Sequence, residues 1–258
     1  DPAGQFYGDH KTFFMGGNNP VGAQSGDDTQ QWTMIRIIDN LTASYELLEG
    51  LTIRTAWSFY LVNFQEFYFR NARYGDGRNI GGFGQETTDN QTNWIGTQTL
   101  SYNKTFNESH NFDFLLGYEA QKTENRRVWT YGEQFPPNPN LRTLNNAAQS
   151  DPSSSNLSGF AFESFFGRVN YNYQYKYYFS ASVRRDGSSR FGSENRYGTF
   201  WSVGGSWRLD QEPFLQGSEF IQELKLRSSY GVTGNAGIGN FDHLQQVSFS
   251  GIDSVSYT

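Results

Sequence analysis

The chain has 258 residues, a formal net charge of -6 at pH 7 and no cysteine. This length fits one large β domain or two ordinary domains. The acidic balance argues against a nucleic-acid-binding surface, which needs clustered basic residues, and the missing cysteines exclude disulfides and thiolate metal sites.

Hydropathy and the N-terminal residues narrow the class of protein. Mean hydropathy is -0.69, and no apolar run approaches the roughly 20 residues of a membrane-spanning helix. Aromatic residues make up 17% of the chain, and Tyr and Trp favour the boundary between water and lipid. The opening residues, DPAGQFYGDH, lack the basic and apolar regions of a signal peptide. We therefore expect either a cytoplasmic protein or an internal part of a longer precursor, and the strand pattern favours the precursor.

Period-two alternation, which is typical of strands, recurs along the chain. In 177–186 the apolar side chains share one face, and Ser180, Ser182, Arg184 and Asp186 share the other. We predict strands at 32–46, 51–62, 94–106, 110–120, 165–173, 177–186, 199–209 and 224–232, and a further strand that begins near Val247.

The predicted connections alternate between short and long. Short turns are expected at 47–50, 107–110 and 173–176, and long loops at about 67–91, at about 124–160 and after Gly231. Outer-membrane barrels have short periplasmic turns and longer extracellular loops. Several predicted strands also reach the about 9–11 residues that cross a bilayer. The pattern favours an all-β, antiparallel transmembrane β-barrel, although a soluble antiparallel sandwich gives the same alternation.

Two segments resemble a known family. SASVRRDGSSRFGSENRYGTFWSVGGSWRLDQEPFL and ELKLRSSYGVTGN are similar to the barrel signature of SusC-like (RagA-like) TonB-dependent outer-membrane transporters of Bacteroidetes. FFGRVNYNYQYKYYFSASV and LTASYELLEGLTIRTAWSFY fit the same family more loosely, so the resemblance spans most of residues 32–240.

The resemblance implies a barrel of about 22 strands that is preceded by a plug domain. Residues 1–258 would then be part of that barrel domain, with residues 1–31 in an extracellular loop and with the plug absent. The rival architecture is a self-contained eight-stranded barrel, whose narrow interior would be filled by side chains.

The same resemblance implies a function. The family imports large nutrients, oligosaccharides or peptides, across the bacterial outer membrane, with energy from the TonB system and with a SusD-like lipoprotein as partner. The barrel itself would contact membrane lipid, and no enzymatic activity and no cofactor are implied. The alternative hypothesis is a soluble β-rich carbohydrate-binding or adhesion module, which would bury the apolar strand faces and be monomeric in plain buffer.

Two groups of residues are candidates for contacts. The aromatic residues expected in long loops could stack on sugar rings or hold peptide side chains, or could equally pack the loops: Tyr74, Phe83, Trp129, Tyr131 and Phe135. Charged residues on polar strand faces are expected to line the lumen or to contact the plug in a structural role: Arg184, Asp186, Arg208, Lys225 and Arg227.

Catalytic and metal-binding patterns are weak. His10, His110 and His243 are scattered without the spacing of metal ligands. A secreted glycosidase remains a third hypothesis, in which Glu124 and Glu133 would be the pair of acidic residues. We expect no catalytic residue and no metal ligand.

Overall fold

The computed structural model describes residues 26–73, 75–215, 220–235 and 237–242, together with Leu244, 247–249 and 255–257. None of the helices in these ranges is long and apolar enough to span a membrane. Contacts divide the chain into two units. The first comprises the described parts of Asp1–Ile38, Tyr60–Thr92 and Glu124–Ser158, and the second comprises those of Asp39–Phe59, Asn93–Thr123 and Gly159–Thr258.

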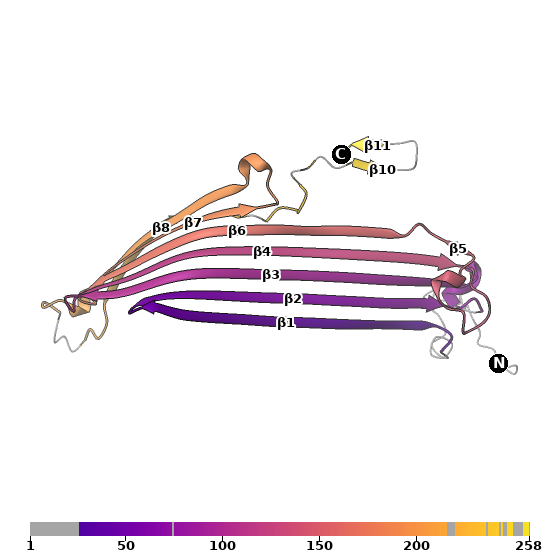
Figure 1. The fold of residues 1–258 in the computed structure, drawn as a ribbon, viewed down its shortest axis with the longest axis horizontal. Helices are drawn as coiled ribbons and strands as arrows, with labels where there is room; N and C mark the ends of the chain where they lie inside the picture. The colour runs from indigo at the N-terminus through magenta and orange to yellow at the C-terminus, as the bar shows by residue number, and fades with distance from the viewer. Residues whose placement is uncertain are drawn as a thin grey trace. The chain divides into compact units, whose positions relative to one another are not determined.

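One antiparallel sheet contains most of the described residues. Its strands follow the order β1-β2-β3-β4-β6-β7-β8-β9, and the short β5 pairs with β4 (Figure 1). A separate hairpin joins β10 (Val247–Phe249) to β11 (Val255–Tyr257). The strands of the sheet are β1 (Thr29–Leu48), β2 (Leu51–Arg70), β3 (Phe83–Phe106), β4 (His110–Glu133), β5 (Gln149–Ser150), β6 (Ser154–Tyr173), β7 (Tyr177–Ser188), β8 (Tyr197–Arg208) and β9 (Lys225–Val232).

Every strand predicted from alternation is present, but several are longer than predicted. β2 continues to Arg70, β3 begins at Phe83, and β4 continues to Glu133. The loops predicted at 67–91 and 124–160 were therefore too long, and they reduce to 71–82 and 134–153. β1 likewise begins at Thr29, inside the loop expected at 1–31, and residues 1–25 lie outside the described part. Backbone pairing continues at these strand ends although hydrophobic alternation has faded, because pairing does not require an apolar face.

The short turns are tight hairpins, as predicted. Asn107 and Glu108 have φ values of 48° and 57°, and Gln174 and Tyr175 have 52° and 54°. Positive φ at both central residues is the geometry of a type I′ turn, whose twist matches that of the flanking strands. Gly50 has φ 81°, and a Cβ atom there would lie 2.2 Å from the Asn103 carbonyl oxygen. Glycine is therefore required at this turn.

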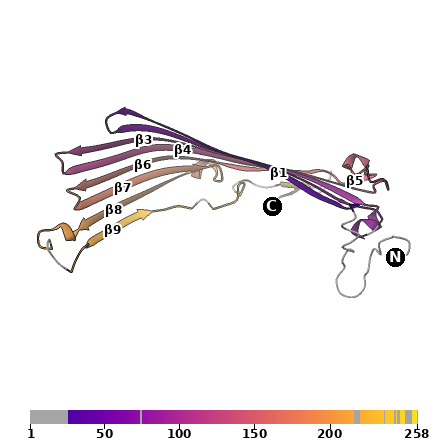
Figure 2. The same ribbon diagram turned by 90° about the horizontal axis from the view of Figure 1, so that it is seen from below.

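Most large apolar side chains of β7, β8 and β9 lie on one face of the sheet, which we call the outer face. The register places Trp207 opposite Tyr177, and Val203 between Ala181 and Tyr230. β7, β8 and β9 lie side by side in Figure 2, in agreement with this register. Exposed fractions on this face are 48% for Phe179, 43% for Trp201 and 36% for Trp207.

No second sheet covers these side chains within the described part of the chain. The soluble sandwich alternative, which required them to be buried, is therefore wrong for this fold. Large apolar side chains that stand uncovered along β7, β8 and β9 are stable only against another apolar medium. The outer face has the character of a surface that contacts lipid.

Two levels of aromatic side chains border this outer face. Near the short turns, the ring centroids of Tyr173 and Tyr177 lie 6.3 Å apart, and those of Tyr177 and Trp207 lie 6.2 Å apart. Tyr197 marks the other border on β8, about ten residues from Trp207. Ten residues at about 3.3 Å each, tilted by about 40°, span roughly 25 Å. This height matches the apolar band between the aromatic girdles of outer-membrane barrels.

Candidate functional site

The inner face, which is the polar face of the second unit, carries several side-chain hydrogen bonds between neighbouring strands. The Asn111 amide donates to Asn172 Oδ1 at 2.9 Å, and the Asn170 amide donates to Asp113 Oδ1 at 2.9 Å. The Ser182 hydroxyl lies 2.7 Å from that of Ser202 on the neighbouring strand. A face of this kind suits contact with water, because its polar groups are paired with one another or exposed to solvent.

Arg184 is the centre of the strongest ionic cluster on this face. Its Nε donates to Asp186 Oδ1 at 2.6 Å, and its Nη2 donates to Ser164 Oγ at 2.7 Å and to Glu119 Oε1 at 3.1 Å. The guanidinium carbon also lies 5.3 Å from the centre of the Phe166 ring. Both carboxylates belong to the same sheet as Arg184. The wall therefore neutralises this cation itself, and contact between the cluster and a plug stays a prediction.

The other three charged residues of the predicted inner set lie near the short turns. Arg208 Nη2 donates to Asp210 Oδ2 at 2.6 Å, and Lys225 Nζ lies 4.5 Å from the centre of the Tyr178 ring. Arg227 is exposed opposite Ser206, and it forms no ion pair with any residue in the described ranges. Within the described residues, Arg208 is paired with a carboxylate, Lys225 contacts a ring, and Arg227 is exposed without an ionic partner.

Asp210 is a buried carboxylate in the connection between β8 and β9. It lies in the 3-10 helix η4 (Leu209–Gln211) and accepts hydrogen bonds from the side chains of Arg208 and Gln211. These bonds, that of Arg208 first, hold the pKa of Asp210 well below its usual range. A depressed pKa in the folded state stabilises the fold above the pKa of the unfolded state, which is about 3.9, and this stabilisation fades as the pH falls below it.

We expect Asp210→Asn to lower the thermal unfolding temperature of the full-length protein in detergent above about pH 5, because the charged hydrogen bonds to Asp210 are lost. The difference from the unmodified protein should shrink progressively below about pH 4. Differential scanning calorimetry at several pH values measures it. Asp242→Asn is a control, because Asp242 has no arginine partner in the described residues. A difference that is the same at pH 3 and pH 7 would contradict this explanation.

A chain of aromatic rings lies on the strand ends of the first unit. Ring centroids lie 5.7 Å apart for Tyr68 and Phe83, 5.8 Å for Phe83 and Tyr131, and 5.8 Å for Tyr131 and Trp129. We call these four residues the aromatic chain. Trp129 and Tyr131 are an even number of positions from Asn125 and Arg127 on β4, so all four side chains point to the same face. Asn125 and Arg127 both contact Asp89 on β3. The aromatic chain therefore occupies the polar face of β4.

The surroundings of the aromatic chain fix two of its rings. The Arg70 guanidinium lies 4.4 Å from the centre of the Tyr68 ring. The Tyr131 hydroxyl donates to Glu133 Oε1 at 2.7 Å. Partial burial and this hydrogen bond raise the pKa of Tyr131 to about 12, so the phenol keeps its proton at neutral pH. Polar groups thus stand beside rings that are only half buried, as in sites that stack on sugars or aromatic side chains.

These positions change how the predicted contact residues are understood. Phe83 begins β3, and Trp129 and Tyr131 belong to β4, so the prediction that these rings stand on loops was wrong. The structure brings the three together and adds Tyr68, which fell in a segment predicted to be loop. Tyr60, Phe64 and Tyr68 lie on the same face of β2. Extending the predicted strand beyond residue 62 on this pattern would have placed Tyr68 on a strand. Tyr74 lies outside the described residues.

Phe135 has a different role from the other predicted rings. It packs edge-on against Phe69 with 5.0 Å between ring centroids, and each of the two is only 5% exposed. A Cβ atom at Gly84 would lie 3.0 Å from the Phe135 ring. Phe69 follows Tyr68 directly on β2, so the two side chains point to opposite faces of the strand. The packing of Phe69 against Phe135 therefore lies on the face opposite the aromatic chain. Phe135 is a core residue of the first unit and has almost no surface for a ligand.

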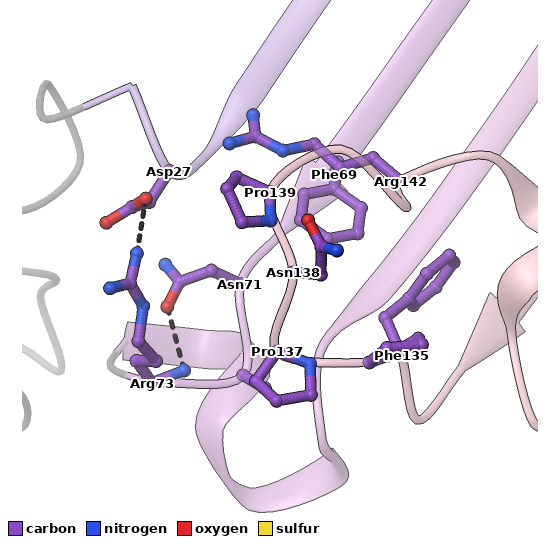
Figure 3. A pocket seen from close by; sticks show the side chains of 11 residues that line it. Asp27, Phe69, Asn71, Arg73, Phe135, Pro137, Asn138, Pro139 and Arg142 are labelled. Carbon is purple, nitrogen blue, oxygen red and sulfur yellow. Dashed lines mark hydrogen bonds and ion pairs between the residues drawn. The ribbon is translucent and has the colours of Figure 1, made fainter.

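The segment 134–148, which we call the loop cover, is fixed over Phe69. Arg142 Nη1 donates to the Gly26 carbonyl and to Thr29 Oγ1, both at 2.9 Å, and its guanidinium lies 5.5 Å from the centre of the Phe69 ring. Figure 3 shows this pocket with the Asp27–Arg73 ion pair beside it. The accessible space is about 30 Å³, which holds only about one or two water molecules. This pocket is a packing gap and not a nutrient site.

The glycosidase hypothesis is inconsistent with the geometry. Glu124 and Glu133 both lie on β4 and are separated by an odd number of positions, so they point to opposite faces. About nine residues of extended strand separate them by roughly 30 Å, whereas glycosidase carboxylates lie within about 10 Å of each other. These residues cannot act on one glycosidic bond.

Comparisons with known proteins agree on one group. No protein-family profile matches the chain. The chain is 37% identical over 210 residues to "TonB-dependent receptor P3" of Formosa agariphila, covering 81% of this chain and 21% of that protein. It is 32% identical over 172 residues to "TonB-dependent receptor SusC" of Bacteroides thetaiotaomicron, covering 65% of this chain and 16% of that protein.

Solved structures give the same result. "Structure of the RagAB peptide transporter" aligns with a TM-score of 0.82 and 27% identity, covering 93% of this chain and 27% of that one. The "open-open" state of the RagAB peptide importer aligns with a TM-score of 0.81. The chain thus spans about a fifth of the length of the curated relatives and about a quarter of the solved ones.

Proposed function

Because this chain is a segment of the outer-membrane β-barrel of the SusC-like TonB-dependent receptors, we propose that the whole protein imports large nutrients, oligosaccharides or peptides. The TonB system would supply the energy, and a SusD-like lipoprotein would close over the long loops. The observation that carries the proposal is the contrast between the two faces: the outer face is apolar and uncovered, and the inner face is a hydrogen-bonded polar surface.

Within this proposal, the aromatic chain is the part of the segment that touches the nutrient. Tyr68, Phe83, Tyr131 and Trp129 present half-buried rings on the polar face of the strand ends. Rings in this arrangement bind the apolar faces of sugar rings and the side chains of peptides. Tyr74, which lies outside the described residues, remains a predicted contact of the same kind.

We expect Trp129→Ala in the full-length protein to weaken nutrient binding about fivefold to tenfold, because a lost aromatic stacking contact is worth roughly 1 kcal/mol. Isothermal titration calorimetry with the protein's own oligosaccharide or peptide measures the affinity. Phe135→Leu is a matched control, since Phe135 is buried away from the aromatic chain. The contact assignment fails if Trp129→Ala binds as tightly as the unmodified protein while retaining its fold.

Import itself needs a separate test. Cells that carry the full-length gene should take up the labelled nutrient only while TonB is functional, and cells without TonB should bind it at the surface without accumulating it. Uptake that continues at the same rate without TonB would contradict the proposed transport mechanism.

A further inference from the structure

Two arginine residues, Arg185 and Arg196, lie at the edge of the outer face that is farther from the short turns. Arg185 is opposite Phe165 and Thr199, one outward-facing position beyond Val183 and Trp201. Its guanidinium lies 5.0 Å from the centre of the Tyr197 ring. Arg196 immediately precedes Tyr197, and both arginines are close enough to interact electrostatically with the Tyr197 hydroxyl. Two cations therefore stand where the apolar band ends.

Among the described residues, Arg185 and Arg196 have no carboxylate partner. The Glu163 carboxylate lies beside them and accepts the hydrogen bond of the Tyr197 hydroxyl. Neither Arg185 nor Arg196 forms an ion pair within the described ranges of the chain. Arg184, the neighbour of Arg185 on the inner face, has two carboxylate partners. Within the described residues, Arg185 and Arg196 thus remain able to bind an anionic group, whereas Arg184 is already paired.

A groove adjoins these residues on the outer face. Its accessible space is about 270 Å³, and its lining includes Trp94, Tyr118, Lys122, Glu163 and Arg196. This wall is locally complete, because β4, β6, β7 and β8 each have both neighbouring strands present in the chain. The residues that line the groove therefore lie within the sheet and not at its edge.

We propose that Arg185 and Arg196 form a binding site for the phosphate of a phosphorylated glycolipid in the outer leaflet. Arginine pairs with phosphate through two parallel N–H donors. The rings of Tyr118 and Trp94 line the adjacent groove and suit the sugar of such a headgroup. The acyl chains would continue over the apolar band beside Val183 and Trp201. A protein partner has no acyl chains that could cover the apolar outer face. A free anion such as phosphate would make no contact with that face.

Native mass spectrometry of the full-length protein, purified in mild detergent and stripped of lipid, tests the site. The probes are a bis-phosphorylated diglucosamine glycolipid, its dephosphorylated form and inorganic phosphate. We expect Arg185→Gln and Arg196→Gln each to reduce affinity for the phosphorylated glycolipid at least fivefold. Arg227→Gln is the matched control, because it removes an exposed cation from the inner face. It should leave affinity unchanged.

Three results would overturn the proposal. The first is unchanged affinity in both outer-face variants when thermal unfolding shows that they remain folded. The second is equal binding of the dephosphorylated lipid, which would reduce the site to the apolar band alone. The third is displacement of the glycolipid by inorganic phosphate at similar concentration, which would identify a general anion site. None of these outcomes depends on which nutrient the protein transports.

Discussion

Replacing Val203 with arginine should lower the free energy of unfolding of the full-length barrel by about 2–4 kcal/mol, which is the cost of a basic side chain at the membrane midplane of such barrels. Val203 lies between Ala181 and Tyr230 in the register, midway between the Trp207 and Tyr197 borders of the outer face. The side chains opposite Val203, which are those of Ala181 and Tyr230, carry no charge with which an arginine could form an ion pair. The unfolding transition in urea, measured in lipid vesicles, gives the value.

Ser202→Arg is the control for this result. Ser202 is adjacent in sequence, but its side chain lies on the inner face and contacts the Ser182 hydroxyl. An arginine there would remain in water and should change the unfolding free energy by less than about 1 kcal/mol. Equal losses for the two variants would mean that the two faces meet similar surroundings, and the membrane orientation of the sheet would then be wrong.

Replacing Phe69 with alanine should release the loop cover. Phe69 and Phe135 are the two apolar side chains that are buried in the described part of the chain. Truncation of a buried phenylalanine usually removes about 3–5 kcal/mol of stability. Here the loss falls on the local packing of 134–148, because the strand pairing of β2 does not depend on the ring. We expect faster amide hydrogen exchange and faster proteolysis within 134–148 in the full-length protein.

Phe67→Ala separates this effect from a general loss of aromatic area. Phe67 shares the face of Phe69, with 6.4 Å between ring centroids, but it is only partly buried. Its truncation should leave exchange in 134–148 within about twofold of the unmodified protein, because the ring does not contact Phe135. If Phe69→Ala leaves this exchange unchanged, the contacts of Phe69 with Phe135 and Arg142 do not hold the segment in place.

Alternation was sufficient to find the strands wherever one face meets lipid and the other meets water. In β7, the contrast between Phe179 and Ser180 is imposed by two different solvents, so the pattern is visible in the sequence. At the ends of β3 and β4 both faces are polar or half buried. The period is then lost although the backbone ladder continues, and the sequence indicated loops there.

The sequence did not predict which individual aromatic residues are exposed to a ligand and which are buried. Tyr131 and Phe135 are four residues apart and chemically similar, and both were predicted as ligand contacts. β4 ends at Glu133, and the chain then turns back over the other face, so one ring joins the aromatic chain and the other is buried against Phe69. Nothing in the local sequence records this reversal.

The sequence by itself determined the existence of the long strands, the tight turns, and the apolar face of β7 and β8, because these depend on neighbours one or two residues away; the short β5 and β11 were not predicted. Only the tertiary structure decided the partners: Glu119 for Arg184, Tyr68 for Phe83, and Phe69 for Phe135. Those pairs join residues between 15 and 66 positions apart. Strand register sets these contacts, and the register is a property of the assembled sheet.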